Sequence, residues 1–392
     1  MEKSLKKLIS LLMVVICLFT VGCAKQAAEN GEEKNFNDPV EQREPPETVT
    51  AKVKVEYGAD FSVEYLEGGV KKLVDGEGRT ILVVPEGAKV PEGAEADEIL
   101  KLPVKNIVAC SSTFVSLMRP LDVFDRIKGV TQDKDNWYMD EIKKGIESGE
   151  IVFVGGDSMG EPDYELVQAL NPDLAMVYTG SFGQYGQIAK FEELGIPYVV
   201  INDYTEEDPL GRLEWIKFLA ALFNEEEKAN IYFAEVEATI DALAHKVAGA
   251  EKPKVAWGMV SGGTVYIPSS VSYVAKQIAM AGGDYVFTDI GDVKTGSVQI
   301  TPEAFYAEAV NADVFIYSSN PLWVPTVDSI VELAPVMEEL QVIKEGNVWA
   351  FQPWYYEALD KTHEQIEDLV AIFYPDLLPD HQIRHYVHLP RE

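Results

Sequence analysis

One short motif in the sequence could carry covalent chemistry. Residues 156–160, Gly-Asp-Ser-Met-Gly, fit the G-x-S-x-G pattern of a nucleophile elbow and follow a predicted strand. A hydrolase would also need an acid and a histidine further along, but three of the five histidines lie in a polar C-terminal tail. Pro162 also delays the helix that should begin directly after the serine. We therefore expect no enzyme, and keep a secreted serine hydrolase using Ser158 as the alternative.

Motifs for phosphate, dinucleotide and zinc binding are absent from the sequence. There is no Walker loop and no GxGxxG fingerprint, and residues 363–367 (His-Glu-Gln-Ile-Glu) miss the HExxH pattern at the last position. No histidine precedes His245, so the first half of the chain has no imidazole to offer a metal ion shared between two halves. We expect no metal site and no cofactor.

Aromatic side chains gather where predicted loops leave the ends of strands. In an open α/β sheet, the loops at the carboxyl ends of the strands line the ligand crevice, so part of these rings should form a wall for a large organic ligand. Basic groups in these loops are few, and Arg119 and Lys294 are the candidates. Three further loop tyrosines, Tyr185, Tyr273 and Tyr356, are not among the residues that we predict to bind the ligand. The residues that we expect to bind the ligand are Ser112, Thr113, Arg119, Trp137, Tyr138, Tyr178, Tyr204, Met259, Tyr266, Trp323, Trp354 and Tyr355.

The N-terminus has the order of an export signal. Three lysines before residue 8 precede a run of 14 uncharged residues, 8–21, which is shorter than the ~20 needed to span a bilayer. The run ends in small residues and Cys23, which resembles a bacterial lipoprotein cleavage site that leaves Cys23 lipidated. An ordinary signal peptide with a chance cysteine is the alternative. Residues 24–50, rich in Glu, Asn and Pro, should form a flexible tether. We expect an extracytoplasmic protein that reaches the membrane only through its lipid.

Composition excludes several classes of protein. The 392 residues include 33 Lys+Arg and 65 Asp+Glu, a formal net charge of −32, which argues against nucleic acid and anionic lipid as partners. A hydrophobic fraction of 47% is enough for a packed core. Three cysteines exclude a disulfide scaffold, and Cys110, within an apolar strand, should be a buried thiol.

The elements that must position these residues fall into three blocks. Residues 51–207 are predicted as an N-terminal lobe that starts with a small β-meander, including the alternating residues 53–57, and continues as alternating strands and helices. Residues 208–250 should be linking helices, the second opened by Asn224 and about 35 Å long. Residues 251–392 are predicted as a C-terminal lobe with a tail. The predicted fold class is therefore α/β, with two Rossmann-like lobes, a long joining helix and a ligand cleft between the lobes.

The two lobes echo each other and resemble a known family. Residues 165–174 (Glu-Leu-Val-Gln-Ala-Leu-Asn-Pro-Asp-Leu) are similar to the E-x-I-x-x-L-x-P-D-L segment of substrate-binding proteins of ABC importers. The group concerned serves iron–siderophore, haem and cobalamin uptake. Glu303-Ala304 with residues 311–314 resembles its second-lobe counterpart, and residues 345–349 resemble its K-x-G-x-V-Y strand. The likeness covers about residues 100–375.

This resemblance implies capture of a metal chelate outside the cell and delivery to an ABC permease. An iron–siderophore is the first expectation, and haem or a corrinoid the next, with Tyr178, Tyr204 or Met259 as candidate axial or capping groups. The family pattern assigns Glu165 and Glu303 to pairing with permease arginines, the alternative being ordinary N-terminal helix charge. We expect a monomer with a small closing motion, and keep an adhesin that has lost the cleft as a further alternative.

Overall fold

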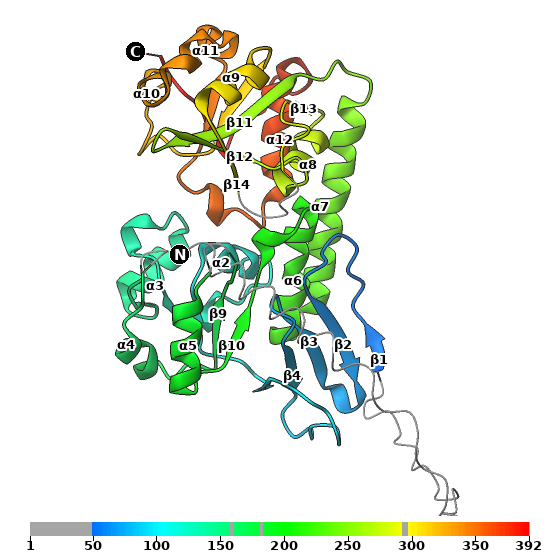
Figure 1. Ribbon diagram of the computed structural model, residues 1–392. Helices are drawn as coiled ribbons and strands as arrows, with labels where there is room; N and C mark the ends of the chain where they lie inside the picture. The colour runs from blue at the N-terminus through cyan, green and yellow to red at the C-terminus, as the bar shows by residue number, and fades with distance from the viewer. Residues whose placement is uncertain (1–48, 157–159, 181–182, 292–296, 392) are drawn as a thin grey trace, which may run out of the picture. The chain divides into compact units, whose positions relative to one another are not determined.

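The computed structural model describes residues 49–156, 160–180, 183–291 and 297–391 (Figure 1). The predicted signal with Cys23, nearly all of the tether, Ser158 and Lys294 lie outside these ranges. Among the residues that are described, no helix is both long and apolar enough to cross a membrane.

A five-stranded sheet begins the described chain, in the order β1-β2-β3-β4-β5. Neighbouring strands are antiparallel from β1 to β4, which confirms the predicted meander, and β5 adds in parallel to β4. Its strands are β1 (Val49–Lys52), β2 (Ser62–Leu66), β3 (Lys71–Val74), β4 (Thr80–Val84) and β5 (Glu98–Lys101).

The alternating residues 53–57 are not a strand, contrary to the prediction. The segment 53–61 instead crosses helix α6 (Pro209–Phe223). Two carboxylates that lie about 150 residues later in the chain accept hydrogen bonds from its backbone N–H groups. The N–H groups of residues 56–58 donate to Glu214 at 2.8–3.0 Å, and those of residues 59 and 60 donate to Glu206 at 2.9 and 3.2 Å. A segment whose donors are held in this way cannot form a sheet ladder.

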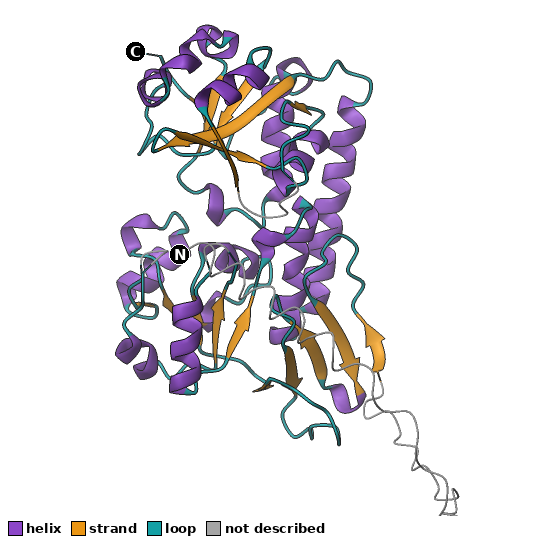
Figure 2. Cartoon of the chain, viewed as in Figure 1, coloured by secondary structure: helices purple, strands orange, loops and turns teal. Residues whose placement is uncertain are grey.

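The first lobe contains a parallel sheet in the order β10-β9-β6-β7-β8, with helices on both faces (Figure 2). Successive side chains of β6 point to opposite faces: Ile107 and Ala109 pack with α2 and α3, whereas Val108 packs with α4 and α5. The elements are β6 (Ile107–Ala109), α2 (Ser112–Met118), β7 (Ile127–Val130), α3 (Asp140–Ser148), β8 (Val152–Phe153), α4 (Tyr164–Ala169), β9 (Leu174–Val177), α5 (Tyr185–Leu194) and β10 (Tyr198–Val200).

Helices α6 and α7 (Glu226–Val247) link the lobes, and α7 runs from the first lobe to the second in Figure 1. Asn224 does not open α7 as predicted. It ends α6 in the left-handed conformation, with φ of 59°, a position that asparagine tolerates better than most residues. Its side-chain oxygen accepts a hydrogen bond from the Lys71 ammonium at 2.7 Å, so it also ties α6 to the N-terminal sheet.

The second lobe is built on a sheet in the order β14-β12-β11-β15-β16-β17, with β13 also paired to β11. Strands β11, β15 and β16 are parallel, and β12, β14 and β17 are antiparallel to their neighbours. The elements are β11 (Lys254–Ser261), β12 (Thr264–Pro268), α8 (Tyr273–Met280), β13 (Asp284–Tyr285), β14 (Ser297–Ile300), α9 (Pro302–Ala309), β15 (Val314–Tyr317), α10 (Val327–Leu333), α11 (Gln341–Glu345), β16 (Val348–Phe351), α12 (Thr362–Phe373) and β17 (Tyr386–His388).

The segment after Pro375 is not the polar tail that its composition indicated. It forms β17 at the edge of the sheet, and His385 is only 2% exposed. The buried carboxylate of Asp368 on α12 accepts hydrogen bonds from the N–H groups of Arg384 and His385, at 2.9 and 2.6 Å. These hydrogen bonds attach the segment to α12. The local sequence pattern of the segment does not reveal this attachment.

The internal echo between the lobes has a structural role. Asp173 in the first lobe accepts hydrogen bonds from the N–H groups of residues 105 and 106, at 2.8 and 3.0 Å, just before β6. Asp313 in the second lobe accepts one from the N–H of Lys254 at 2.7 Å, where β11 begins. In each lobe the repeated aspartate thus holds the start of the neighbouring central strand.

Candidate functional site

A cavity of about 850 Å³ is lined by residues of both lobes. In the first lobe its wall comes from the loops that follow β6, β7, β9 and β10. Strands β6 and β9 are neighbours whose following helices, α2 and α5, cover opposite faces of the sheet, so a crevice opens between them. In the second lobe the wall comes from the hairpin β11–β12, the start of α8, the start of β14, and the loops after β15 and β16.

Most of the residues predicted to bind a ligand lie on this wall, although ligand binding itself stays a prediction. Tyr178 follows β9 and Met259 lies on β11, as the crevice argument expects. Nine of the twelve predicted residues line the cavity: Ser112, Thr113, Trp137, Tyr138, Tyr178, Tyr204, Met259, Tyr266 and Trp323.

Arg119 lies away from the cavity wall and contacts the other lobe. Its guanidinium Nη2 donates to the carbonyl oxygen of Glu357 at 2.9 Å, and Nη1 lies 3.4 Å from the carboxylate of Asp360. Both partners follow β16 in the second lobe, more than 200 residues later in the sequence. Arg119 was predicted to bind the ligand, but in the structure it connects the two lobes.

Trp354 and Tyr355 are also absent from the wall. The Trp354 indole donates its N–H to the carbonyl oxygen of Arg384 at 3.2 Å. Tyr355 is 4% exposed and stacks on Phe351, with ring centroids 3.8 Å apart. Tyr356, the next residue, lines the cavity instead, because consecutive residues of this short helical turn point in different directions.

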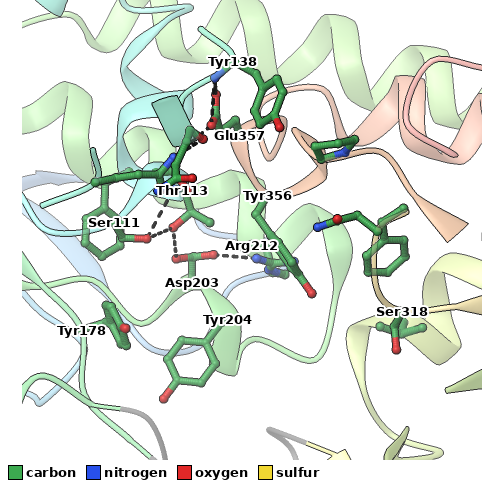
Figure 3. Close-up of a pocket in the computed structure, with 18 of the residues that line it drawn as sticks. Ser111, Thr113, Tyr138, Tyr178, Asp203, Tyr204, Arg212, Ser318, Tyr356 and Glu357 are labelled. Atoms are coloured by element: carbon green, nitrogen blue, oxygen red, sulfur yellow. Dashed lines mark hydrogen bonds and ion pairs between the residues drawn. The ribbon is translucent and has the colours of Figure 1, made fainter. Parts of the chain in front are cut away.

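Sequence reasoning missed the polar centre of the wall. Arg212 on α6 is 8% exposed, and its Nη2 donates to Asp203 at 2.9 Å. The guanidinium also lies 4.2 Å from the ring centroid of Tyr273. Asp203 accepts a second hydrogen bond, from the Thr113 hydroxyl at 3.3 Å (Figure 3). Residues 209–223 are mostly apolar, and the three charged residues among them, Arg212, Glu214 and Lys217, are the signal that could have drawn attention to Arg212.

Burial keeps two phenols of this wall protonated. It raises the pKa of Tyr204 to about 12 and also raises that of Tyr178, so both phenols stay protonated at neutral pH. Tyr204 donates its hydroxyl to the carbonyl of Thr179. Burial likewise raises the pKa of Asp203, and the Arg212 guanidinium opposes that rise. The Tyr204 proton is already donated to Thr179, so towards a ligand this hydroxyl can act only as an acceptor. Protonated phenols are poorly suited to bind a metal ion as phenolates.

An interlobe latch, which we define as Glu357 with Arg119, joins the two lobes beside the cavity. The buried Glu357 carboxylate accepts hydrogen bonds from the N–H groups of Tyr138 and Met139 at 2.9 and 3.0 Å, and from the Gln132 amide at 3.2 Å. Figure 3 shows Glu357 beside Tyr138 at the edge of the site. Because a carboxylate of the second lobe satisfies backbone donors before α3 of the first, the latch favours a fixed angle between the lobes.

Asp360 should give the protein a distinct pH dependence. Burial raises its pKa from the usual 3.8 to about 7, against the opposing effect of Arg119. Between pH 4 and 7 the unfolded chain has released this proton while the folded chain retains it, so the wild type loses stability as pH rises, on the order of 4 kcal/mol. Asp360→Asn removes this titration. Urea unfolding at several pH values measures the free energy of unfolding of both proteins. The value for the variant should rise relative to that of the wild type from pH 4 to 7. A difference between the two proteins that does not change with pH would contradict the assignment.

The other predicted groups are placed as follows. Cys110 is free and buried, and burial raises its pKa to about 12, which keeps the thiol protonated. Within the described ranges, no group of three or more His, Cys, Asp and Glu side chains could hold a metal ion. Glu165 and Glu303 are exposed in the first turns of α4 and α9, which are capped by the side chains of Asp163 and Thr301.

The family follows from comparison with known proteins. The sequence model described as "Periplasmic binding protein" matches residues 107–353, from β6 of the first lobe through the linking helices to the loop after β16 of the second. The chain belongs to the periplasmic binding protein family. This match confirms the fold and the family resemblance inferred from the sequence. Members of the family bind small solutes and serve ABC transporters.

Relatives of this periplasmic binding protein carry the name lipoprotein. One uncharacterized lipoprotein of Methanocaldococcus jannaschii is 32% identical over 95% of this chain and 94% of its own length. A second from the same organism is 26% identical over 97% of this chain and 98% of its own length. The similarity includes the N-terminal sheet, which precedes the part matched by the family model.

Solved structures share the fold of this periplasmic binding protein at low sequence identity. The haem-binding protein RhuT from Roseiflexus sp. RS-1 is 19% identical, with a TM-score of 0.55, over 70% of this chain and 99% of that one. A periplasmic haem-binding protein from Pseudomonas aeruginosa is 15% identical, with a TM-score of 0.56, over 69% of this chain and 93% of that one. These likenesses show the fold alone.

Proposed function

We propose that this periplasmic binding protein captures a metal chelate outside the cell, a ferric siderophore first among the candidates, and delivers it to an ABC permease. The cavity of about 850 Å³ carries the proposal, because rings from both lobes line it. A volume of this size suits an organic ligand of several hundred daltons, and flat or hydroxamate-like groups pack well against ring faces. The ring-bearing residues on the wall are Phe114, Trp137, Tyr138, Tyr178, Tyr204, Trp257, Tyr266, Tyr273, Trp323, Phe351 and Tyr356.

The neutral phenols favour a ligand that already holds its metal. Tyr178 and Tyr204 keep their protons at neutral pH, so neither is set up to bind a bare metal ion as a phenolate. Haem and corrinoids remain the next candidates, since their large rings suit the same wall. Affinity would come from burial of ligand surface in a largely preformed site.

The proposed location is outside the cytoplasmic membrane, with Cys23 as the lipid anchor. Support comes from the charged and apolar order of residues 1–23 and from relatives that are named lipoproteins. In this arrangement the monomeric body is tethered close to the permease. Exposed Glu165 and Glu303, one on each lobe, are the proposed contacts with permease arginines.

A fluorescence titration tests the capture of a chelate. The purified protein would be titrated with ferrioxamine B, haemin and cyanocobalamin, with the metal-free siderophore as control. Trp323 and Trp137 lie on the wall, so a coloured ligand in the cavity should quench their emission. Saturable quenching by one class at micromolar or lower concentration supports the proposal. Absence of saturable binding by all three classes would count against it.

Trp323 is predicted to contribute strongly to affinity. It is 80% exposed on the cavity wall, so it can cover a ligand, and its loss leaves no hole in the core. Trp323→Ala should weaken binding by about tenfold in titration calorimetry while the melting temperature stays unchanged. Leu333→Ala, at an exposed position on α10 outside the cavity, is the matched control and should bind like the wild type. Equal affinities in both variants would show that Trp323 does not touch the ligand.

A further inference from the structure

We infer that the cargo of this cavity carries either no net charge or a positive one. This inference rests on the proposed capture of a chelate and narrows the chemistry of that chelate. The charged residues that line the cavity, within the described part of the chain, are one cation and two carboxylates, Arg212, Asp203 and Glu357, a net formal charge of −1.

The single cation of that set is already neutralised. Arg212 and Asp203 are 8% and 2% exposed, and their side chains meet at 2.9 Å. The face of Tyr273 covers the guanidinium at 4.2 Å, which satisfies part of the remaining positive charge. An anionic ligand would therefore compete with a close, preformed ion pair, and breaking a buried pair leaves one partner unpaired.

Glu357 makes the wall negative or, when protonated, neutral. Its carboxylate accepts three hydrogen bonds from the first lobe, which stabilise the charged form. Burial acts in the opposite direction and raises its pKa. The charged form of Glu357 repels an anionic cargo, and the protonated form offers it no attraction between opposite charges.

The other residues of the wall and the net charge of the whole chain also disfavour an anionic cargo. Ring faces carry partial negative charge and attract cations, and eleven ring-bearing residues line the cavity. The chain as a whole has a formal net charge of −32, which repels anions at distances within the screening length. These terms favour ferric trihydroxamates, which are neutral at the metal, over trianionic tricatecholates, and disfavour haem with two free propionates.

A series of chelates that differ only in charge tests the inference. Ferrioxamine B carries a free ammonium group, its N-acetyl derivative is neutral, and its N-succinyl derivative carries a carboxylate, while the ferric trihydroxamate core stays the same. The cationic member should bind roughly tenfold more tightly than the anionic one at low salt, and 0.5 M NaCl should shrink the difference. Haemin and haemin dimethyl ester form a second pair, in which the ester should bind more tightly.

A new lysine on the wall provides the decisive comparison. Ser318 lines the cavity beyond β15, and Figure 3 shows it on the side opposite Asp203, so Ser318→Lys adds one positive charge at the site. This variant should flatten or reverse the charge order. Gln341→Lys, which adds the same charge at an exposed position on α11, should leave it unchanged. Melting curves would confirm that both variants fold.

The outcomes separate this inference from the proposed function. Tighter binding of the anionic members by the wild type would overturn the inference and leave chelate capture standing. A charge order that Ser318→Lys does not alter would also overturn it. Absence of binding by every probe in both series would overturn chelate capture itself, and the inference with it.

Discussion

Replacing Glu165 and Glu303 together by lysine is expected to reduce uptake by at least about 100-fold while ligand affinity stays within twofold of wild type. Each carboxylate is exposed in the first turn of a helix, one on α4 and one on α9. Charge-assisted pairs with guanidinium groups are among the stronger polar contacts, and reversal of both charges turns two attractions into two repulsions. Neither residue lines the cavity, so binding of the cargo should not change.

The docking experiment compares uptake of a radiolabelled ligand in cells that express the permease with each form of the binding protein. The matched control is Glu150→Lys with Glu308→Lys, which changes the net charge equally at exposed positions of the same two lobes. The control should transport like the wild type. Normal uptake by the Glu165 and Glu303 double variant would mean that the permease contacts another surface.

Glu214→Ala is expected to lower the free energy of unfolding by about 3–5 kcal/mol. The Glu214 side chain is fully buried and accepts hydrogen bonds from the N–H groups of residues 56–58. It also lies 2.6 Å from the ammonium group of Lys217. Alanine at this position leaves three backbone donors without their acceptor and the buried Lys217 ammonium without its carboxylate, and each loss carries a desolvation cost.

Urea unfolding and hydrogen exchange would test the role of Glu214. The amides of residues 56–58 should exchange faster in the variant, because the segment loses its attachment to α6. Glu235→Ala, at an exposed position on α7, is the control and should change stability by less than about 0.5 kcal/mol. A loss below about 1 kcal/mol for Glu214→Ala would show that water replaces the carboxylate.

Local pattern was a good guide to the elements of both lobes. The alternation of apolar runs and helical periodicity predicted strands β6 to β10 and helices α2, α4 and α5, and the structure confirms these elements. Helix α3, between β7 and β8, was not among the predicted elements. The same reasoning failed for residues 53–57, whose alternation looks like a strand. Their backbone donors pair with Glu214, more than 150 residues away, and no local window contains that information.

The site was predictable where it follows from topology. Tyr178 and residues 111–113 lie at a switch point of the parallel sheet, so the order of strands alone places them at the crevice. Tyr355 and Tyr356 were not separable in this way. They are neighbours in a short turn, one of which stacks on Phe351 while the other lines the cavity.

Residue type and spacing alone were enough to predict the two-lobed α/β fold, the family, and the abundance of rings and scarcity of cations in the loops that line the cavity. These properties follow from residue type and periodicity, which act over a few residues. Only the tertiary structure decided that Arg119 braces the lobes and that Arg212 pairs with Asp203 on the wall. Arg119 meets a partner that is 238 residues away, and Arg212 sits in a helix whose whole length is buried, so packing between elements assigns their roles.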